Sequence, residues 1–299
     1  MSERAWKLAG APISWGVCEV PGWGPMLPPD RVLGEMATLG LTATELGPDG
    51  YLPADPAELR ALLGKHGLSL VAAFVPAVLH EDDRTAGLEH VRRQAAVLTE
   101  LEAEQMLFAP VVDLGWTLPS GLDQRGWENL AAGLGEAGEI ARAAGIGCCV
   151  HPHLGSLVET AEDIRNLTAL TEVEWCFDTA HLMIGGVDQL EFAREHADLI
   201  RHVHLKDVDG DMAAKLARRE LTHLEAASDE AFLPLGQGDA PVAAVIETLT
   251  EAGYDGWMVL EQDTSLSGPD VPEGDGPVND VRLSLEFIRA LDDAAAVRA

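Results

Sequence analysis

Short runs of apolar residues alternate along the chain with longer segments in which apolar residues recur every three or four positions. A run that is apolar throughout is typical of a strand buried on both faces of a parallel sheet, whereas the longer spacing is typical of an amphipathic helix. The pattern predicts strands at residues 8–14, 42–46, 68–74, 106–109, 146–151, 175–178, 200–205 and 257–261. Eight strands that alternate with helices indicate successive βαβ units.

The helices between these strands have recognisable first and last residues. Pro56 in a first turn and Thr160 as an N-cap mark two starts, and Gly40, Gly67 and Gly145 mark three ends. The predicted helices are at residues 30–39, 56–66, 86–103, 127–144, 161–170 and 189–196, followed by two with helical spacing at 242–249 and 281–288.

These elements predict an α/β fold, a (β/α)8 TIM barrel, as a single domain over residues 1–299. The length agrees, because about 250 residues is typical of such a barrel, and no break in composition marks a second domain. Two long connections lie near residues 207–239 and 265–280, and the first contains a predicted short helix at 212–223. Both follow strand ends, which places them on the face where barrel enzymes have their active sites.

The formal net charge of −30 argues against two kinds of partner. Nucleic acids and anionic membranes are both bound mainly through Lys and Arg, so we expect neither. No stretch reaches the roughly 18 apolar residues of a membrane helix, and the N-terminus lacks the pattern of a signal peptide. The four cysteines include no metal-type CxxC pair, which favours reduced thiols and a cytoplasmic location.

Side chains that commonly bind metal ions stand where four successive predicted strands end. They are His151 and His153, Asp178, His202 and His204, and Glu261. Because the carboxyl ends of barrel strands converge on one mouth, these side chains should lie close together. Imidazole and carboxylate groups without a thiolate suit Mn, Fe, Co, Zn or Mg, so a divalent metal cofactor is predicted. His202 and His204 face the same way because strand residues alternate, and only one of them needs to bind the ion.

Several of these residues have a second interpretation. Asp178 could instead cap a helix that begins at Thr179, since Asp is a favoured N-cap. Lys206 is one of only four lysines, which favours a catalytic role over that of a solvated charge. Glu45 ends the second strand, where it could hold a hydroxyl, act as an acid or base, or form a buried salt bridge. Trp15 could form an apolar wall for a polyol ring or belong to the core. Further candidates for substrate binding are His153, His181, His202 and Asp207.

The order of these motifs resembles that of a known family. Residues 11–25, Ala-Pro-Ile-Ser-Trp-Gly-Val-Cys-Glu-Val-Pro-Gly-Trp-Gly-Pro, followed by Leu-Pro-Pro-Asp-Arg-Val-Leu and Thr-Glu-Leu-Gly-Pro, are similar to the inosose dehydratases. His-Pro-His-Leu-Gly-Ser-Leu-Val-Glu-Thr, Phe-Asp-Thr-Ala-His and His-Val-His-Leu-Lys-Asp fit the same group. That family belongs to the xylose-isomerase-like TIM barrels, with sugar phosphate isomerases, epimerases and endonuclease IV. The resemblance extends from the first strand to Glu261.

The resemblance implies four metal ligands after strands five to eight. By position these are His151, Asp178, His204 and Glu261. The first is a departure, because many epimerases of the superfamily have glutamates at the first and last positions as paired acid and base groups. A histidine in place of the first glutamate fits an elimination better than a two-carboxylate epimerisation. Whether His151 or His153 is the ligand stays open.

The activity implied by the resemblance is a metal-dependent lyase that dehydrates a cyclic polyol ketone such as an inosose. A proton next to the ketone would be removed, a β-hydroxyl would leave as water, and the metal would polarise the ketone. Lys206 would act as an acid or an oxyanion partner, and Glu261 or a histidine as the base, with His151 and Glu45 as further catalytic candidates. The partner is then a small polyol or sugar, and a homo-oligomer is compatible with the sequence.

Three other functions remain to be weighed. The nearest is a metal-dependent sugar or sugar phosphate isomerase or epimerase on the same barrel. A DNA repair hydrolase similar to endonuclease IV is disfavoured by the net charge of −30 and the lack of a basic stripe. A binding protein without activity is disfavoured by the complete set of metal-type side chains.

Overall fold

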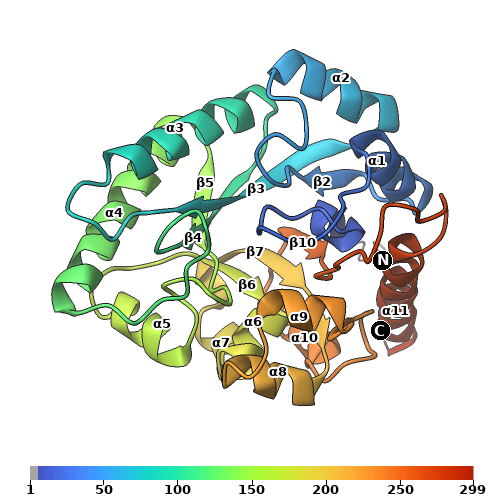
Figure 1. Ribbon diagram of the computed structural model, residues 1–299. Coiled ribbons are helices and arrows are strands. Elements are labelled where there is room, and N and C mark those ends of the chain that lie inside the picture. The colour runs from blue at the N-terminus through green and yellow to red at the C-terminus, as the bar shows by residue number, and fades with distance from the viewer. Residues whose placement is uncertain (1–5, 299) are drawn as a thin grey trace.

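The computed structural model describes residues 6–298. Eight parallel strands close into a barrel in the order β1, β10, β7, β6, β5, β4, β3, β2, which confirms the predicted TIM barrel (Figure 1). The strands are β1 (Lys7–Gly10), β2 (Ala43–Glu45), β3 (Ser69–Ala77), β4 (Gln105–Pro110), β5 (Gly147–Val150), β6 (Trp175–Asp178), β7 (Ile200–Leu205) and β10 (Trp257–Leu260). The ring closes where β1 pairs with β10, from Lys7 opposite Trp257 to Gly10 opposite Leu260.

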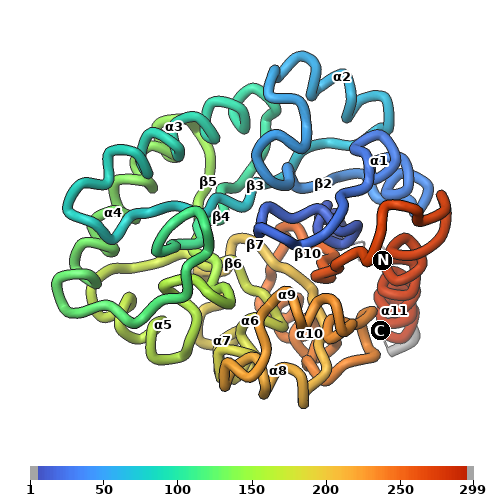
Figure 2. The backbone as a smooth tube through the Cα atoms, viewed as in Figure 1, coloured from blue at the N-terminus to red at the C-terminus, as the bar shows by residue number. Residues whose placement is uncertain are grey.

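Helices surround the barrel and bury their apolar faces against it (Figure 2). Their bounds are α1 (Pro29–Thr38), α2 (Pro56–His66), α3 (Thr85–Glu100), α4 (Gln124–Ala143), α5 (Ala161–Thr168), α6 (Thr179–Ile184), α7 (Gln189–Glu195), α8 (Gly210–Ala217), α9 (His223–Ser228), α10 (Val242–Glu251) and α11 (Pro277–Arg298). Thr160 caps α5 as predicted, in a capping box with Asp163. No helix within residues 6–298 combines the length and hydrophobicity that a membrane crossing needs.

The first strand is shorter than predicted. The chain leaves the barrel after Gly10 and turns into a 3-10 helix at Pro12–Trp15. Proline has no amide hydrogen for a strand ladder, so Pro12 starts the 3-10 helix instead. The prediction of a strand through residues 11–14 is therefore wrong.

Alternation along the strands separates an apolar layer from a polar one inside the barrel. Small residues from several strands, including Ala9, Ala43, Cys149, Cys176 and Val259, are buried together in the interior. The inward position two residues further along each of four strands is polar. These pairs are Ala43 and Glu45, Cys149 and His151, Cys176 and Asp178, and Val259 and Glu261. The polar side chains therefore stand above an apolar plug at the carboxyl end of the barrel.

The long connection after β7, residues 207–239, is a folded segment, which we call the excursion. A two-stranded antiparallel sheet, β8 (Asp207–Val208) and β9 (Phe232–Leu233), encloses α8 and α9. The single helix predicted at 212–223 is wrong, because Arg219 has a φ of 58° that interrupts the helical backbone and Thr222 caps a new helix. A separate apolar cluster fixes the excursion to the barrel, and it includes Trp23, Ala180, Val208, Leu216, Ala226 and Phe232.

Asp207 serves this excursion and not the mouth of the barrel. Its carboxylate accepts hydrogen bonds from the backbone amides of Gly236 at 2.8 Å, Gly238 at 3.0 Å and Ala240 at 3.0 Å. A side chain on Gly238 would lie 2.4 Å from the same carboxylate, which explains the glycine there. The side chain faces away from the mouth because it follows the inward-facing Lys206 by one position. The prediction that Asp207 binds substrate is thus corrected.

Candidate metal centre and active-site pocket

Four side chains from consecutive strands meet at the carboxyl end of the barrel. They are the predicted set, His151, Asp178, His204 and Glu261. Oδ2 of Asp178 lies 3.5 Å from Nε2 of His151 and 3.6 Å from Nδ1 of His204. Oε2 of Glu261 contacts the same Nδ1. Asp178, His204 and Glu261 also form one of the buried groups whose ligand atoms lie within 4.8 Å of one another.

Several polar atoms of this cluster have no hydrogen-bond partners among the described residues. They are both ring nitrogens of His151, Oδ2 of Asp178, Nδ1 of His204 and Oε2 of Glu261. Buried polar atoms are almost always satisfied, and an unsatisfied one costs free energy. A divalent cation between them would satisfy all four residues at once. The donor set therefore fits the predicted metal, and its mixture of imidazole and carboxylate groups leaves the metal's identity open.

Asp178 both caps a helix and faces the candidate metal cluster, and these are the two roles that the sequence allowed. Its Oδ1 accepts hydrogen bonds from the amides of Ala180 and His181, each at 2.9 Å, and so caps α6. Its Oδ2 faces the cluster. Burial opposes the negative charge, but Lys206 and His181 hold the pKa of the carboxyl well below its usual range. The cap fixes the side chain, and the ionised second oxygen stays available to a cation.

Glu45 holds the metal-facing histidine in one orientation. Its Oε1 accepts a hydrogen bond from Nε2 of His202 at 2.8 Å and from Nε2 of His204 at 2.9 Å. With Nε2 of His204 donating, Nδ1 is the nitrogen that can offer a lone pair to a metal, as in carboxylate–histidine–metal arrangements. Burial raises the pKa of Glu45, but the two histidines outweigh burial and lower it. The buried salt bridge considered for Glu45 is therefore present.

Without a metal, a proton can occupy the same position. Burial lowers the pKa of His204, but the acidic groups of Cys176, Glu261 and Glu45 raise it well above the usual value. A proton on Nδ1 would bridge His204 to Glu261. Since metal ligands must be deprotonated, binding of a cation would displace this proton.

Lys206 is fully buried, which excludes a solvated charge. Its Nζ lies 2.7 Å from Oδ1 of Asp263, 3.0 Å from Oε1 of Glu261 and 3.1 Å from Nε2 of His181. A lysine ammonium has three hydrogens, so these three contacts use all of them. Burial disfavours the charge, but Asp178, Asp263 and Glu261 raise the pKa of Lys206 well above its usual value. The side chain thus stays charged beside the cluster and has no free donor for a substrate oxyanion.

The structure brings His151 and not His153 into the cluster. Nδ1 of His153 lies 2.8 Å from the carbonyl oxygen of Leu154, to which it donates, so its Nε2 keeps a lone pair. His153 lines the pocket above the cluster. Burial and the neighbouring His181 lower the pKa of His153 well below its usual value, so its ring is neutral. A neutral imidazole at this place can accept a proton or a hydroxyl hydrogen bond.

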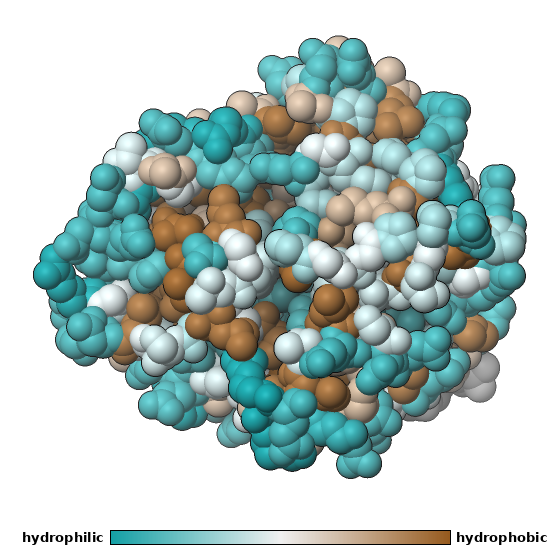
Figure 3. Space-filling view, in the orientation of Figure 1, coloured by the Kyte–Doolittle hydropathy of each residue, from teal (hydrophilic) through white to brown (hydrophobic). Residues whose placement is uncertain are grey.

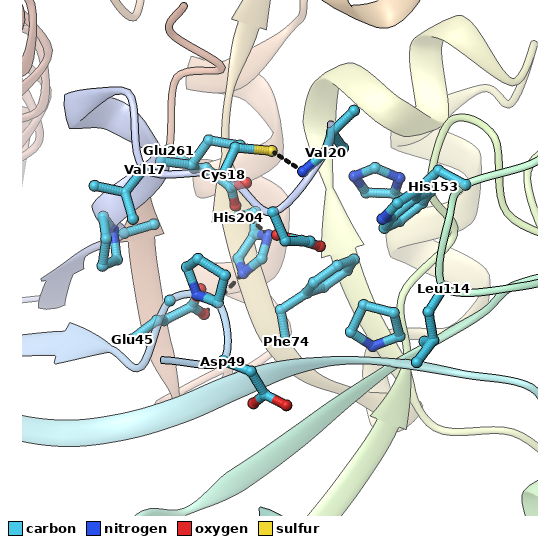
Figure 4. A pocket seen from close by; sticks show the side chains of 18 of the residues that line it. Val17, Cys18, Val20, Glu45, Asp49, Phe74, Leu114, His153, His204 and Glu261 are labelled. Carbon is cyan, nitrogen blue, oxygen red and sulfur yellow. Dashed lines mark hydrogen bonds and ion pairs between the residues drawn. The ribbon is translucent and has the colours of Figure 1, made fainter. Parts of the chain in front are cut away.

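The cluster forms part of the floor of a cavity of about 230 Å³. Figure 4 shows Glu45 and Glu261 on either side of His204, with His153 across the pocket. Phe74 and Trp116 stack at 6.0 Å and, with Leu114, form an apolar wall. On the face shown in Figure 3, hydrophobic residues gather near the centre and hydrophilic ones around the edge. Apolar walls above a polar floor suit a ring with hydroxyl groups.

The described lining of this cavity lacks the lysine and arginine side chains that usually bind a phosphate. None of the described residues that line it is Lys or Arg, whereas Glu19, Glu45, Asp49 and Glu261 are all present. An acidic surface repels a phosphate dianion, since phosphate sites rely on Arg, Lys or backbone amides. The cavity therefore favours an uncharged substrate.

Three predicted substrate-binding residues lie outside the pocket. Trp15 is fully buried in the core, with Nε1 donating to Oε2 of Glu35 at 2.8 Å. His202 lies below His204 and uses Nε2 on the Glu45 carboxylate. His181 is 1 % exposed and contacts Lys206. All three side chains are buried outside the pocket, which corrects their predicted role.

Some residues of the site were not predicted. Asp263 follows Glu261 by two positions, and the alternation that brings Glu261 inward was a usable signal for it. His223 reaches the pocket from α9, at the far side of the excursion, and no local pattern indicated this. Asp49 and Phe74 also line the pocket.

The imidazole and carboxylate donors lie at the carboxyl-end mouth of a closed barrel, which is where (β/α)8-barrel enzymes have their active sites. The fold and the site together therefore define a (β/α)8 barrel with a candidate metal centre. The profile of the "Xylose isomerase-like TIM barrel" family matches residues 33–291. An inosose dehydratase of Geobacillus kaustophilus (strain HTA426) is 32% identical over 281 residues, which cover 88% of this chain and 90% of that protein. The chain belongs to the xylose isomerase-like TIM barrel family and, within it, is a relative of the inosose dehydratases.

Two solved structures agree on the fold. An L-ribulose 3-epimerase has a TM-score of 0.71 at 18% identity, with 98% of this chain and 97% of that chain covered. An IOLI protein described as having a bound zinc atom has a TM-score of 0.69 at 15% identity, with 96% of this chain and 98% of that chain covered. Both similarities show the shared fold.

The choice between the two neighbouring histidines can be tested by a pair of variants. His151→Ala should lose bound metal, because its ring belongs to the unpartnered cluster. His153→Ala should keep the metal and lose turnover, because its Nδ1 is bonded to Leu154 and its ring lines the pocket. Metal analysis of both proteins after identical loading and desalting provides the measurement. Loss of metal from His153→Ala alone would reverse the assignment.

Proposed function

We propose that this protein is a metal-dependent lyase that removes water from a cyclic polyol ketone such as 2-keto-myo-inositol. The observation that carries the proposal is the cluster of unpartnered atoms of His151, Asp178, His204 and Glu261 beneath a cavity that has no Lys or Arg among the described residues that line it. The similarity to inosose dehydratases supports the substrate class.

His151, Asp178, His204 and Glu261 would hold the metal. When bound, a divalent ion supplies Lewis acidity that polarises a carbonyl oxygen. Two carboxylates and two neutral imidazoles leave this set with one negative charge fewer than a set that has glutamate in the first position. Lys206 and Glu45 fix the ligands from outside, through Glu261 and His204. These contacts make Lys206 and Glu45 positioning residues in the proposal.

Removal of a proton next to the ketone needs a base in the pocket. His153 is suited to this step because Nε2 keeps its lone pair and the ring is neutral. Glu261 is less available to act as the base, since Lys206 donates a hydrogen bond to one of its oxygens and His204 contacts the other. We assign His153 as the base, and Phe74 and Trp116 as the wall against which the ring of the substrate packs.

Epimerisation of an unphosphorylated ketose is the alternative on the same barrel. It requires a group that returns a proton to the opposite face of the same carbon. In relatives that use paired glutamates, one of them stands at the first ligand position, where this chain has His151. We therefore propose that the reaction is loss of water and not inversion. The free cysteines favour a reducing compartment, so we also propose a cytoplasmic location.

The proposal is tested by comparing two kinds of substrate. Protein loaded with Mn or Co is incubated separately with 2-keto-myo-inositol and with ketohexoses. The expected product is an unsaturated diketone that absorbs in the ultraviolet, formed only from the inosose. Clean epimerisation of a ketohexose with no dehydrated inosose would contradict the lyase and favour the epimerase.

A further inference from the structure

We propose that His223 is the general acid that protonates the departing hydroxyl group, and that Asp263 is the residue that positions it. This inference rests on the proposed dehydration and assigns the one proton transfer that His153 and the metal ligands leave open. His223 is supplied by α9 of the excursion, so the folded connection after β7 would contribute to catalysis as well as cover the barrel.

The two residues form a pair with a defined geometry. Nε2 of His223 lies 2.7 Å from Oδ2 of Asp263. The Asp263 side chain is fully buried, and its other oxygen, Oδ1, accepts a hydrogen bond from Nζ of Lys206 at 2.7 Å. The His223 side chain is 16 % exposed and lines the same cavity as Glu261 and His153. A buried carboxylate behind a pocket-lining imidazole is an arrangement that orients the ring for proton transfer.

The ring of His223 is also held by its neighbours. Trp23 contacts it edge-on, with ring centroids 5.0 Å apart, and Phe232 does so at 5.6 Å. Trp23 is itself fixed, since its Nε1 donates to the carbonyl oxygen of Thr264 at 2.7 Å. With Nε2 on Asp263, Nδ1 of His223 forms no hydrogen bond to any residue in the described range. This nitrogen is the one available to a substrate hydroxyl.

Other histidines at the pocket are unsuited to the role of acid. His204 belongs to the candidate metal cluster, and Nε2 of His153 is an acceptor. His90 stands at the rim, where its Nδ1 lies 3.9 Å from Asp49, beyond hydrogen-bond distance. Among the described residues that line the cavity and lie outside the candidate metal cluster, His223 alone pairs an unbonded ring nitrogen with a buried carboxylate.

The elimination balances with these residues. His153 takes the proton from the carbon next to the ketone, and the electron pair of that C–H bond forms the new carbon–carbon double bond. The C–O bond at the neighbouring carbon breaks, and its electron pair stays with oxygen. His223 donates its Nδ1 proton to this oxygen, which leaves as water. His153 then releases a proton to solvent and His223 takes one up, so no other reactant is needed.

A change of leaving group separates an acid from a residue that only shapes the pocket. Fluoride needs no proton to depart, so an inosose in which fluorine replaces the leaving hydroxyl bypasses the acid. His223→Gln should lower kcat for 2-keto-myo-inositol by about 10²–10⁴-fold, the range for loss of a general acid. With the fluoro compound the loss should be less than about tenfold on the same reasoning. Bound metal should be unchanged.

Two further variants complete the experiment. Asp263→Asn should show the same pattern with a smaller loss, because it leaves the ring in place and removes the charge behind it. His66→Gln is the matched control: its Nε2 also bonds an aspartate, Asp30 at 2.9 Å, and its side chain is 13 % exposed, but it lies outside the pocket. His66→Gln should match the unaltered protein with both compounds.

The outcomes of these measurements distinguish a general acid from a structural residue, and failure of this inference from failure of the proposed function. Equal losses for both compounds in His223→Gln would overturn the acid role and leave a structural one. Unchanged turnover of the inosose would overturn any role in catalysis. If the unaltered protein releases neither water nor fluoride, the proposed function itself fails. If it dehydrates the inosose while His223→Gln does so equally well, only this inference fails.

Discussion

Replacing Asp178 with asparagine should remove bound metal and dehydration together. The substitution keeps an oxygen for the cap of α6, where Oδ1 accepts two backbone hydrogen bonds. It replaces the unpartnered Oδ2 with an amide that cannot ligate a cation as a carboxylate does. Loss of residues that only support a ligand costs about 10–100-fold in metal affinity or activity, and loss of a direct ligand should exceed this range.

Asp207→Asn is the matched control for this prediction. Asp207 is as deeply buried as Asp178 and also accepts backbone hydrogen bonds, but it lies in the excursion and outside the pocket. Its substitution should lower the free energy of unfolding and leave metal content per folded chain unchanged. Inductively coupled plasma analysis and thermal unfolding of both variants check the pair. Full metal content in Asp178→Asn would place the metal elsewhere.

Lys206→Met should destabilise the metal-free protein more than any surface substitution. It removes the buried cation that faces Asp178, Glu261 and Asp263, at 3.5, 3.0 and 2.7 Å from its Nζ. Breaking a buried ion pair typically costs about 3–5 kcal/mol, because the remaining charges are left uncompensated. A bound divalent ion would neutralise two of these carboxylates, so added metal should raise the melting temperature of the variant more than that of the unaltered protein.

Turnover by this variant should also fall by about 10–100-fold, the range for outer partners of a metal site. Lys206 has no hydrogen left for substrate, so its effect is exerted through Glu261 and Asp263. Lys215→Met serves as the control, since Lys215 is an exposed lysine on α8 whose Nζ lies 3.7 Å from the sulfur of Met212, outside the pocket. Near-normal turnover with unchanged unfolding in Lys206→Met would contradict the account of Lys206 as a buried counter-charge.

The strand ends could be predicted from sequence because one physical rule governs them. Apolar runs locate the strands, and the carboxyl ends of parallel strands in a barrel converge, so Asp178, His204 and Glu261 had to be close. The same alternation distinguishes Lys206, which faces inward with His204, from Asp207, which faces outward. The sequence pattern contained this distinction, and the prediction that Asp207 binds substrate overlooked it.

The remaining features depend on contacts between distant segments. The choice of His151 as the candidate ligand depends on its contacts with Asp178 and His204, which form only when the strands close into the barrel. Trp15 lies in the core because the chain turns at Pro12 and directs the indole to Glu35. His223 meets Asp263 only after the excursion folds onto the barrel through its own apolar cluster. Such pairings follow from tertiary packing, which short-range periodicity does not encode.

One titration tests the central claim that the cluster of His151, Asp178, His204 and Glu261 holds the ion on which dehydration depends. Protein stripped of metal by a chelator receives Mn²⁺ in steps, and bound metal and the rate of water loss from 2-keto-myo-inositol are measured at each step. The account predicts a rate that rises in proportion to occupancy and stops rising at one ion per chain. Full turnover before any metal binds, or full occupancy without dehydration, would contradict it.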